Sequence, residues 1–190
     1  MKKEFDKKIF KEMILYVAER CADKPNFGST HLNKILHYTD FFWYGHTGES
    51  LSGETYLCAK HGQVPKHFEE VRDELVREGF LAMVEKRCVD YVQKRPTVLK
   101  KIELTALSQE QREFIDTIIV WLVDHTAGYV SDQVAHEDLA WKYLNPGDEI
   151  PYETVFFRRK KNLSAGEIEA AQAFIEAYEE KLKERPLAAV

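Results

Sequence analysis

Apolar residues recur at helical spacing along much of this chain, and this period constrains the fold more than any other feature of the sequence. The first set comprises Phe5, Ile9, Phe10, Met13, Ile14, Val17 and Cys21. Residues three and four apart share one face of a helix, so the spacing predicts an amphipathic helix over residues 5–22. Acidic residues interrupt the apolar positions after the basic start, which argues against a signal peptide.

Two more helices are expected after the turn KPNFG at 24–28. Ser29 is the predicted N-cap of the first, and the GHTG segment at 45–48 is predicted to end it. Its expected inner face comprises Leu32, Ile35, Leu36, Thr39 and Trp43. Pro65 suits the first turn of the next helix, which is expected to bury Phe68, Val71 and Leu75 and to close at Gly79 in the left-handed conformation.

Residues 80–105 change to an alternating pattern that predicts a β-hairpin, with a turn marked by Pro96. The motif from Ser108 to Gln111 is a capping box, and the apolar run at 118–123 predicts a helix buried nearly all round. Residues 128–161 are irregular, and a second capping box, from Ser164 to Glu167, is expected to start a closing helix that runs to about Arg185.

The composition fits one soluble domain over residues 1–190. Hydrophobic residues make up 44% of the chain, which is enough for a core, and no apolar run approaches the ~18 residues of a membrane span. The expected fold is mainly α, a single compact helical domain with a small hairpin at about 80–105. The net charge of −5 argues against a dedicated nucleic-acid binder, because phosphate contacts need a basic face.

The hairpin together with helix 66–79 also suggests a winged-helix-like element. In that interpretation the helix would enter the major groove of DNA. Its acidic residues outnumber its basic ones, however, so DNA binding is the weaker alternative. The acidic residues are Glu69, Glu70, Asp73, Glu74 and Glu78.

Neither a metal site nor an active site is predicted, and no cofactor is expected. Cys21, Cys58 and Cys88 are scattered, which favours free thiols in a reducing cytoplasm. Cys58 and His61 have ligand-compatible spacing, with Cys88 or His67 as a third ligand, but no second close pair completes a tetrahedral site. An acid–base group of Asp40, His61, His136 and Glu137 is the catalytic alternative, and we expect a protein that is not an enzyme.

Two polar segments carry the candidate contacts for a protein partner. In the first, Tyr56 is expected to pack beneath the chain with its hydroxyl on a buried partner, while Lys60, His61 and Gln63 stay near the surface. In the second, His136 precedes Trp141 and Tyr152, which are aromatic residues of the kind that anchor interfaces. We expect the 60–65 segment and the 136–152 region to lie close together and form one surface.

A series of fixed spacings in these regions matches a known family. The first block comprises Lys34, Leu36, Tyr38, Asp40, Gly48, Leu51, Gly53, Tyr56, Ala59, Gly62, Val64 and Pro65. The second comprises Ser131, His136, Trp141, Gly147, Ile150, Pro151 and Tyr152. Over about residues 10–155 the chain resembles the Panacea domain of SocA-like antitoxins, a family also met among phage-associated proteins. Gln63 departs from the pattern, since the family usually has proline there.

The resemblance implies a stand-alone intracellular antitoxin that neutralises a cognate protein toxin by direct binding. Antitoxins of the SocA type act as adaptors that deliver the toxin to a Clp-type protease, so an adaptor role is a further expectation. A winged-helix-like nucleic-acid-binding regulator of a prophage or mobile element is the alternative function.

Overall fold

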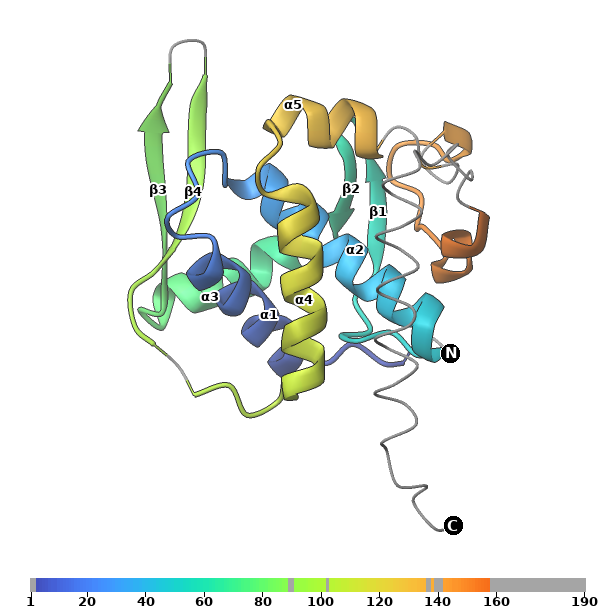
Figure 1. Ribbon diagram of the computed structural model, residues 1–190, viewed down its shortest axis with the longest axis horizontal. Coiled ribbons are helices and arrows are strands. Elements are labelled where there is room, and N and C mark those ends of the chain that lie inside the picture. Colours follow the sequence, from blue (N-terminus) through green and yellow to red (C-terminus); the bar gives the residue numbers. More distant parts are fainter. Residues whose placement is uncertain (1–2, 89–90, 102, 136–137, 139–141, 158–190) are drawn as a thin grey trace, which may run out of the picture. The chain divides into compact units, whose positions relative to one another are not determined.

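Three long helices, α1, α2 and α4, pack around the main hydrophobic core (Figure 1). The computed structural model describes residues 3–88, 91–101, 103–135, 138 and 142–157. All of these lie in the first of the two units into which the chain divides, Met1–Arg158. Within the described residues the structure is mainly helical with two small antiparallel hairpins, as the sequence predicts for its fold class.

Helix α1 spans Lys7–Arg20, inside the predicted range of 5–22. Asp6 caps it by accepting a hydrogen bond from the amide of Ile9 at 3.0 Å. The predicted face is buried, with Phe10, Met13, Ile14 and Val17 fully enclosed. Since the apolar period places all four on one side, burial of this face holds α1 in the core.

Helix α2 spans Ser29–Thr47 and ends, as predicted, at the GHTG segment, where Gly48 adopts a φ of 80°. The prediction that Ser29 caps it is wrong. The N-cap is Gly28, and the hydroxyl of Ser29 instead donates to the carbonyl of Lys94 at 3.2 Å. Strand β4 (Val92–Val98) lies so close to the start of α2 that the serine hydroxyl bonds to the strand and not to its own helix.

The polar segment after α2 forms a hairpin that the sequence pattern did not predict. Strands β1 (Tyr56–Ala59) and β2 (Gly62–Pro65) are antiparallel, and Tyr56 pairs with Pro65. Pro65 therefore ends a strand, and the expectation that it sits in the first turn of a helix is wrong. Helix α3 begins later and spans Phe68–Arg77.

Helix α3 ends as predicted, with Gly79 at a φ of +73°. The amide of Phe80 bonds to the carbonyl of Leu75 at 2.9 Å and that of Gly79 to Val76 at 3.0 Å, which is the Schellman pattern. The acidic side of α3 faces α1, since Lys7 pairs with Glu70 and Glu74 while Lys11 pairs with Glu74 and Glu78. These acids are thus engaged within the protein, and a winged-helix element is not confirmed.

The second hairpin consists of β3 (Leu81–Arg87) and β4 (Val92–Val98), within the predicted range of 80–105. The predicted turn at Pro96 is wrong, because Pro96 lies inside β4 opposite Met83. Proline cannot donate to a ladder, but it is tolerated in an edge strand, and both strands of a two-stranded sheet are edges. The pairing continues past the strand ends to Cys88, whose amide bonds to the carbonyl of Tyr91 at 2.9 Å.

Helix α4 spans Gln109–Leu122, and the predicted capping box between Ser108 and Gln111 is confirmed. The prediction that this helix is buried nearly all round is wrong. Ile115, Ile118, Ile119 and Leu122 are buried, whereas Val120 is 74% exposed. The apolar run at 118–123 therefore belongs to an amphipathic helix with an apolar residue on its solvent side.

The remaining named elements are short helices. They comprise α5 (Ala127–Tyr129), a π-helix (Val130–Ala135) and a 3-10 helix (Tyr152–Phe157). The closing helix expected from Ser164 lies outside the described residues, and a single domain over 1–190 stays a prediction. In the described part of the chain, no helix has the length and apolar character needed to cross a bilayer.

Candidate functional site

The candidate site lies where α2 meets the β1–β2 hairpin. Lys34, His37 and Asp40 follow one another at three-residue intervals, which puts them on the same side of α2. All three side chains are buried. Ionisable groups are seldom fully buried without specific partners. These side chains therefore serve contacts inside the protein and not contacts with water.

Asp40 holds the loop that leads into β1. Its carboxylate accepts hydrogen bonds from the amide of Ser52 at 2.7 Å and from the Ser52 hydroxyl. Burial raises the pKa of this carboxyl to about 6, although hydrogen bonds from Ser52 and Tyr56 oppose the shift. The buried carboxylate thus ties residue 52 to the middle of α2.

Tyr56 completes this cluster from the first residue of β1. Its hydroxyl lies 2.7 Å from Asp40 Oδ2 and 2.9 Å from the carbonyl oxygen of Leu36, and the ring is fully buried. The prediction that Tyr56 packs beneath the segment with its hydroxyl on a buried partner is confirmed. Burial also raises the pKa of Tyr56, which therefore stays a neutral donor.

Lys34 holds the other end of the hairpin. Its Nζ donates to the carbonyl of Gln63 at 2.8 Å, and burial lowers the pKa of the amine to about 7. Gly62 makes this approach feasible, since a Cβ there would lie only 2.5 Å from Lys34 Nζ and 2.8 Å from the Cβ of Ala135. With a φ of +96°, residue 62 also needs glycine for its backbone conformation.

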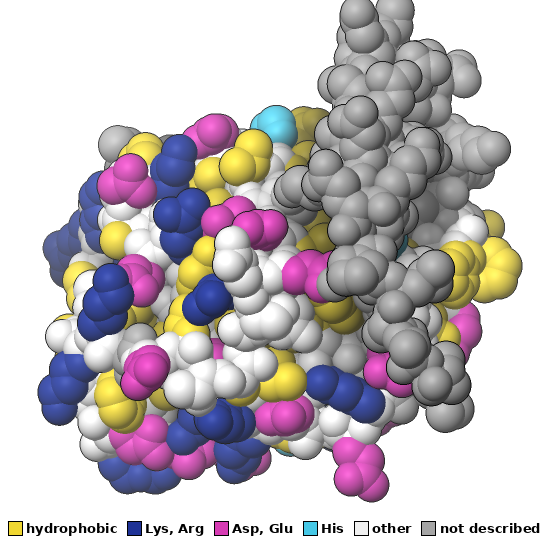
Figure 2. All heavy atoms as spheres, turned by 60° about the horizontal axis from the view of Figure 1, so that its bottom comes forward, with side chains coloured by type: hydrophobic (Ala, Val, Ile, Leu, Met, Phe, Trp, Pro, Cys, Tyr) yellow, Lys and Arg dark blue, Asp and Glu magenta, His cyan; other side chains and the backbone are white. Residues whose placement is uncertain are grey.

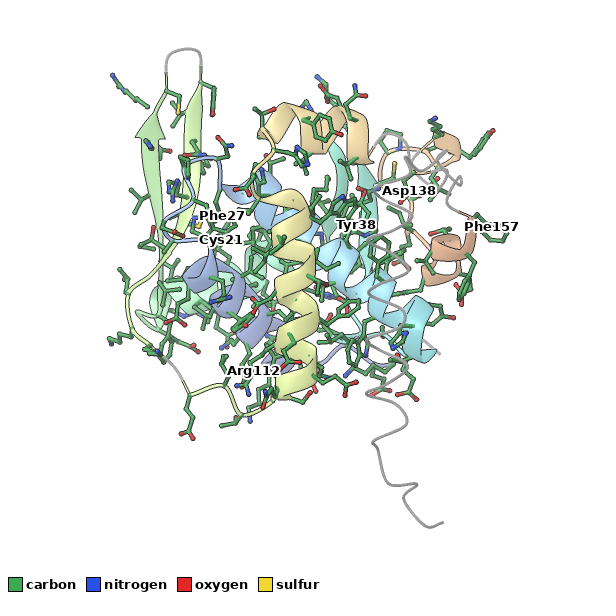
Figure 3. The ribbon with its side chains drawn as sticks, in the orientation of Figure 1. Cys21, Phe27, Tyr38, Arg112, Asp138 and Phe157 are labelled. Atoms are coloured by element: carbon green, nitrogen blue, oxygen red, sulfur yellow. The ribbon has the colours of Figure 1, made fainter. Side chains whose placement is uncertain are left out.

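Gln63 is buried, so the expectation that it stays near the surface is wrong. Its Nε2 lies 3.4 Å from the carbonyl oxygen of Ala135 and 3.4 Å from Asp138 Oδ2. Asp138, labelled in Figure 3, also lies 3.9 Å from Nε2 of His37. Where the family usually has proline, this chain has an amide that links β2 to the end of the π-helix.

A second buried acid lies at the entrance to β1. Glu54 is fully enclosed, and its Oε1 accepts from the amide of Thr55 at 2.6 Å and lies 2.9 Å from Nδ1 of His67. Burial raises the pKa of Glu54, while His67 acts in the opposite direction. His67 in turn stacks on Phe5, which connects this acid to the N-terminal segment.

Tyr152 is buried beside this acid, although the sequence marked it as an interface anchor. Its hydroxyl donates to the carbonyl of Glu54 at 2.7 Å, and its ring stacks on Phe41 with 4.5 Å between centroids. Tyr152 therefore packs inside the protein, within a cluster that also holds Tyr44, Tyr56, Cys58 and Ile150.

The residues left at the surface are those of the β1–β2 turn. Lys60 and His61 are exposed, as predicted. The carbonyl of His61 accepts a hydrogen bond from Ser131 at 3.2 Å, so the π-helix supports the turn from beneath.

The 60–65 segment and the 136–152 region meet at Gln63, whose Nε2 lies 3.4 Å from Asp138 Oδ2, and the strand residues just before the first segment also contact the second region. Leu57 bridges to Glu149, the amide of Cys58 bonds to Asp148 at 2.9 Å, and the amide of Gly147 bonds to Cys58 at 2.8 Å. His136 and Trp141, the other predicted contacts, lie outside the described residues. The proximity of the two segments is confirmed, while the use of these residues by a partner stays a prediction.

Tyr143 is a surface residue that sequence reasoning missed. It is 82% exposed, and its neighbour Leu144 contacts Cys58, two residues before Lys60. No sequence signal marked it, because Ala140, Trp141 and Leu144 are its apolar neighbours along the chain, and only the structure shows that its side chain is exposed. We call Lys60, His61 and Tyr143 the tip surface.

The described residues give no support to the catalytic alternative or to the metal-site alternative. Asp40 is enclosed whereas His61 is exposed on the turn, and His136 and Glu137 are not described. Among the described residues, no group of three His, Cys, Asp or Glu side chains is arranged to hold a metal ion. Figure 2 shows Lys and Arg side chains interspersed with Asp and Glu on the face in view, and not a continuous basic patch.

Comparison with known proteins gives one match. The family model described as "Antitoxin SocA-like, Panacea domain" matches residues 32–142. No curated protein and no solved structure matches the chain. The matched range contains the buried residues Lys34, Asp40, Tyr56 and Gln63 together with the β1–β2 turn.

Proposed function

The chain belongs to the family of SocA-like antitoxins with a Panacea domain, and from this we propose that it neutralises a protein toxin in the cytoplasm by binding it directly. The observation that carries the proposal is the contrast within the site. Charged and polar side chains that could do chemistry are enclosed and bonded to backbone, while Lys60 and His61 of the β1–β2 turn and Tyr143 are exposed. Such an arrangement supports a role for the buried groups in fixing the turn and its exposed surface.

The tip surface has the composition of a small interface. Tyr143 offers a large aromatic side chain that becomes an anchor once a partner covers it, and aromatic residues of this kind supply most of the binding energy of protein interfaces. Lys60 and His61 lie at the rim, where charges mainly steer association. The buried bonds from Lys34 and Ser131 hold the turn in place, so little order has to be gained on binding.

The test measures the affinity for the product of the adjacent gene, the toxin candidate used as the probe. Replacing Tyr143 by alanine should weaken binding by on the order of 2 kcal/mol, about thirtyfold, and reduce growth rescue on co-expression. The matched control is Tyr91→Ala, which removes another exposed tyrosine, on the β3–β4 hairpin. Unchanged affinity in Tyr143→Ala, or an equal loss in Tyr91→Ala, would exclude the tip surface.

Stability has to be measured in parallel, because a loss of fold also lowers affinity. The exposed position of Tyr143 predicts a change in unfolding free energy within about 0.5 kcal/mol. If loss of toxin binding follows loss of stability in every variant, the tip surface is not the contact.

Stoichiometry separates a binder from an enzyme. A binder protects against the toxin only when it is at least equimolar, because each molecule occupies one toxin. In a purified assay without a protease, full protection by a small fraction of an equivalent would show catalytic turnover and contradict the proposal. A toxin half-life that shortens only when a Clp-type protease is present would assign the adaptor role; an unchanged half-life would assign neutralisation by occlusion.

A further inference from the structure

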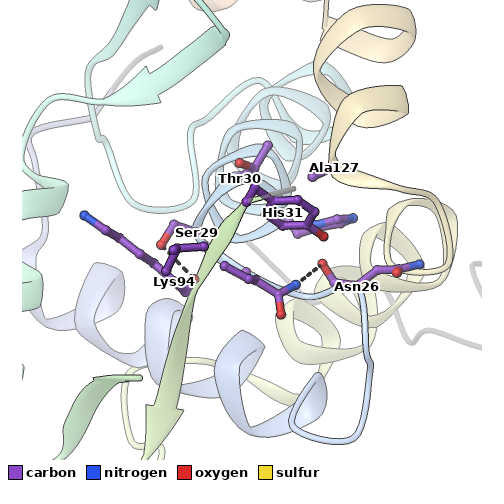
Figure 4. A pocket seen from close by; sticks show the side chains of 10 residues that line it. Asn26, Ser29, Thr30, His31, Lys94 and Ala127 are labelled. Carbon is purple, nitrogen blue, oxygen red and sulfur yellow. Dashed lines mark hydrogen bonds between the residues drawn. The ribbon is translucent and has the colours of Figure 1, made fainter. Parts of the chain in front are cut away.

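The outer edge of β3 is a surface that the function proposed above does not use. Its sheet has two strands, so each strand has one edge that faces away from the other. The edge of β4 lies against the start of α2, where the hydroxyl of Ser29 donates to the carbonyl of Lys94 at 3.2 Å (Figure 4). Figure 1 shows β3 on the opposite side of the hairpin. Among the described residues, no hydrogen bond reaches the backbone of β3 from outside the hairpin.

The register of the hairpin identifies the backbone groups that point outward. Paired residues of an antiparallel ladder alternate between pairs that exchange hydrogen bonds and pairs that do not. The amide of Leu99 bonds to the carbonyl of Phe80 at 2.8 Å at one end, and the amide of Cys88 bonds to that of Tyr91 at the other. Counting inward from either end assigns the even-numbered residues of β3 to bonded pairs. The amides and carbonyls that point away from β4 are therefore those of Leu81, Met83, Glu85 and Arg87.

The same alternation explains why Pro96 fits in β4. Pro96 is opposite Met83 in a non-bonded pair, so its missing N–H would have pointed away from β3. Proline on an edge removes a donor and discourages the pairing of another strand there. Strand β3 contains no proline, so its open edge keeps a complete set of donors and acceptors.

The side chains beside this edge indicate what kind of strand it accepts. Val84 is 46% exposed, and Lys86 is exposed on the same face of the strand, two residues further on. A strand paired with β3 would place an apolar side chain beside Val84 and an acidic one beside Lys86, also two residues apart. Basic residues outnumber acidic ones across residues 80–101. The basic residues are Lys86, Arg87, Lys94, Arg95, Lys100 and Lys101, and the acidic ones are Glu85 and Asp90.

We propose that the outer edge of β3 pairs with an extended acidic segment of a partner protein, which adds a third strand to the hairpin. In such pairing the backbone hydrogen bonds supply affinity, and alternate side chains supply specificity. A second copy of this chain is a poorer occupant, because it would bring the same basic residues against one another. The edge of β3 and the tip surface share no residue, so one can bind a partner without the other.

The test is an NMR titration of the whole chain with a synthetic peptide of sequence TEETVITT, blocked at both ends. When it pairs antiparallel to β3, its valine lies opposite Val84 and its second glutamate opposite Lys86. We expect saturable binding that protects the amides of Met83, Glu85 and Arg87 from exchange with water. A peptide with lysines in place of both glutamates should bind at least about tenfold more weakly.

Methylation of single peptide nitrogens tests the backbone pairing directly. The threonine opposite Glu85 would donate its amide to β3, whereas the valine opposite Val84 would point its amide away. Methylation of the threonine nitrogen should weaken binding by about tenfold or more, because a backbone hydrogen bond is lost and the strands are held apart. Methylation of the valine nitrogen is the matched control and should change the affinity by less than about twofold.

Variants of the chain place the site. Glu85→Pro removes an outward donor of β3 without affecting its bonds to β4, and should weaken binding by about tenfold or more. Its control, Glu85→Gln, also removes the charge but keeps the N–H, so it should bind no less tightly. Retained protection of the Val84 amide shows that the hairpin is intact in both. Lys86→Gln should weaken binding by about threefold, and Lys8→Gln, at an exposed lysine of α1, should not.

Four results would overturn the proposal. They are full binding by Glu85→Pro with the hairpin intact, equal weakening by the two methylated peptides, no saturable binding of the unmodified peptide, and a dimer of the natural chain that Glu85→Pro dissociates. Sedimentation of the natural chain and of Glu85→Pro at several concentrations detects the last of these.

Discussion

At the scale of single residues, the unusual feature is a buried lysine, Lys34, whose amine packs against Gly62. Lys34 donates to the carbonyl of Gln63, and burial lowers its pKa to about 7 from an ordinary value of 10.5. Between these two pH values the unfolded chain binds more protons than the folded one. Stability contributed by Lys34 is therefore fully present above pH 10.5 and is lost as the pH falls toward 7.

This difference predicts a pH dependence that Lys34→Met removes. The unfolding free energy of the natural chain should rise relative to that of the variant by about 1 kcal/mol per pH unit above pH 7. Urea denaturation of both proteins at several pH values measures it, and other titrating groups cancel in the difference. The pH range lies above the pKa of Asp40, so that carboxyl does not interfere. Parallel profiles for the two proteins would show that Lys34 titrates normally.

At the scale of elements, the sequence predicted those whose signal is local. The apolar period of α1, the capping box of α4 and the left-handed glycine after α3 all depend on residues within a turn or two. The prediction that Ser29 caps α2 is wrong because the partner of this residue is distant in sequence. Its hydroxyl bonds to Lys94, 65 residues away, and no local pattern contains that partner.

The β1–β2 hairpin shows why the rest could not be predicted. Each strand has four residues, too few for alternation to stand out, and one ends in proline. Its position depends on Asp40, Lys34 and the 142–150 segment, which are distant in sequence. Gln63 was placed at the surface for the same reason, since only the fold reveals that Asp138 and Ala135 lie beside it.

At the scale of the whole described unit, α2 belongs to both hydrophobic clusters. Leu32, Ile35 and Leu36 lie in the main core, while Phe41 and Tyr44 lie in the cluster with Tyr152. Tyr38 links the main core to the π-helix, since its hydroxyl donates to the carbonyl of Val134 at 3.2 Å. Displacing α2 would therefore disturb the core and the candidate site together.

Glu12 connects α1 to the start of α4 across this unit. Its buried carboxylate accepts from the amides of Thr105, Ala106 and Leu107 at 2.9–3.0 Å. Glu12→Gln removes the charge and points an amide donor at backbone donors, so it should lower the unfolding free energy by about 2 kcal/mol. Glu49→Gln, at an exposed glutamate, is the control in urea denaturation. Coincident unfolding curves for the two variants would mean that Glu12 is not the connection.

The contact between Gly62 and Lys34 also restricts how related sequences diverge. Any side chain at residue 62 would meet the amine of Lys34 and the methyl of Ala135 and would have to adopt a φ of +96°, so a shorter residue 34 alone does not make room for it. In descendants of a common ancestor residue 62 should therefore stay glycine. Lys60 and His61, two residues and one residue before this glycine, face no such restraint. Under the function proposed above, selection would keep this scaffold while the tip surface beside it changes with each new toxin.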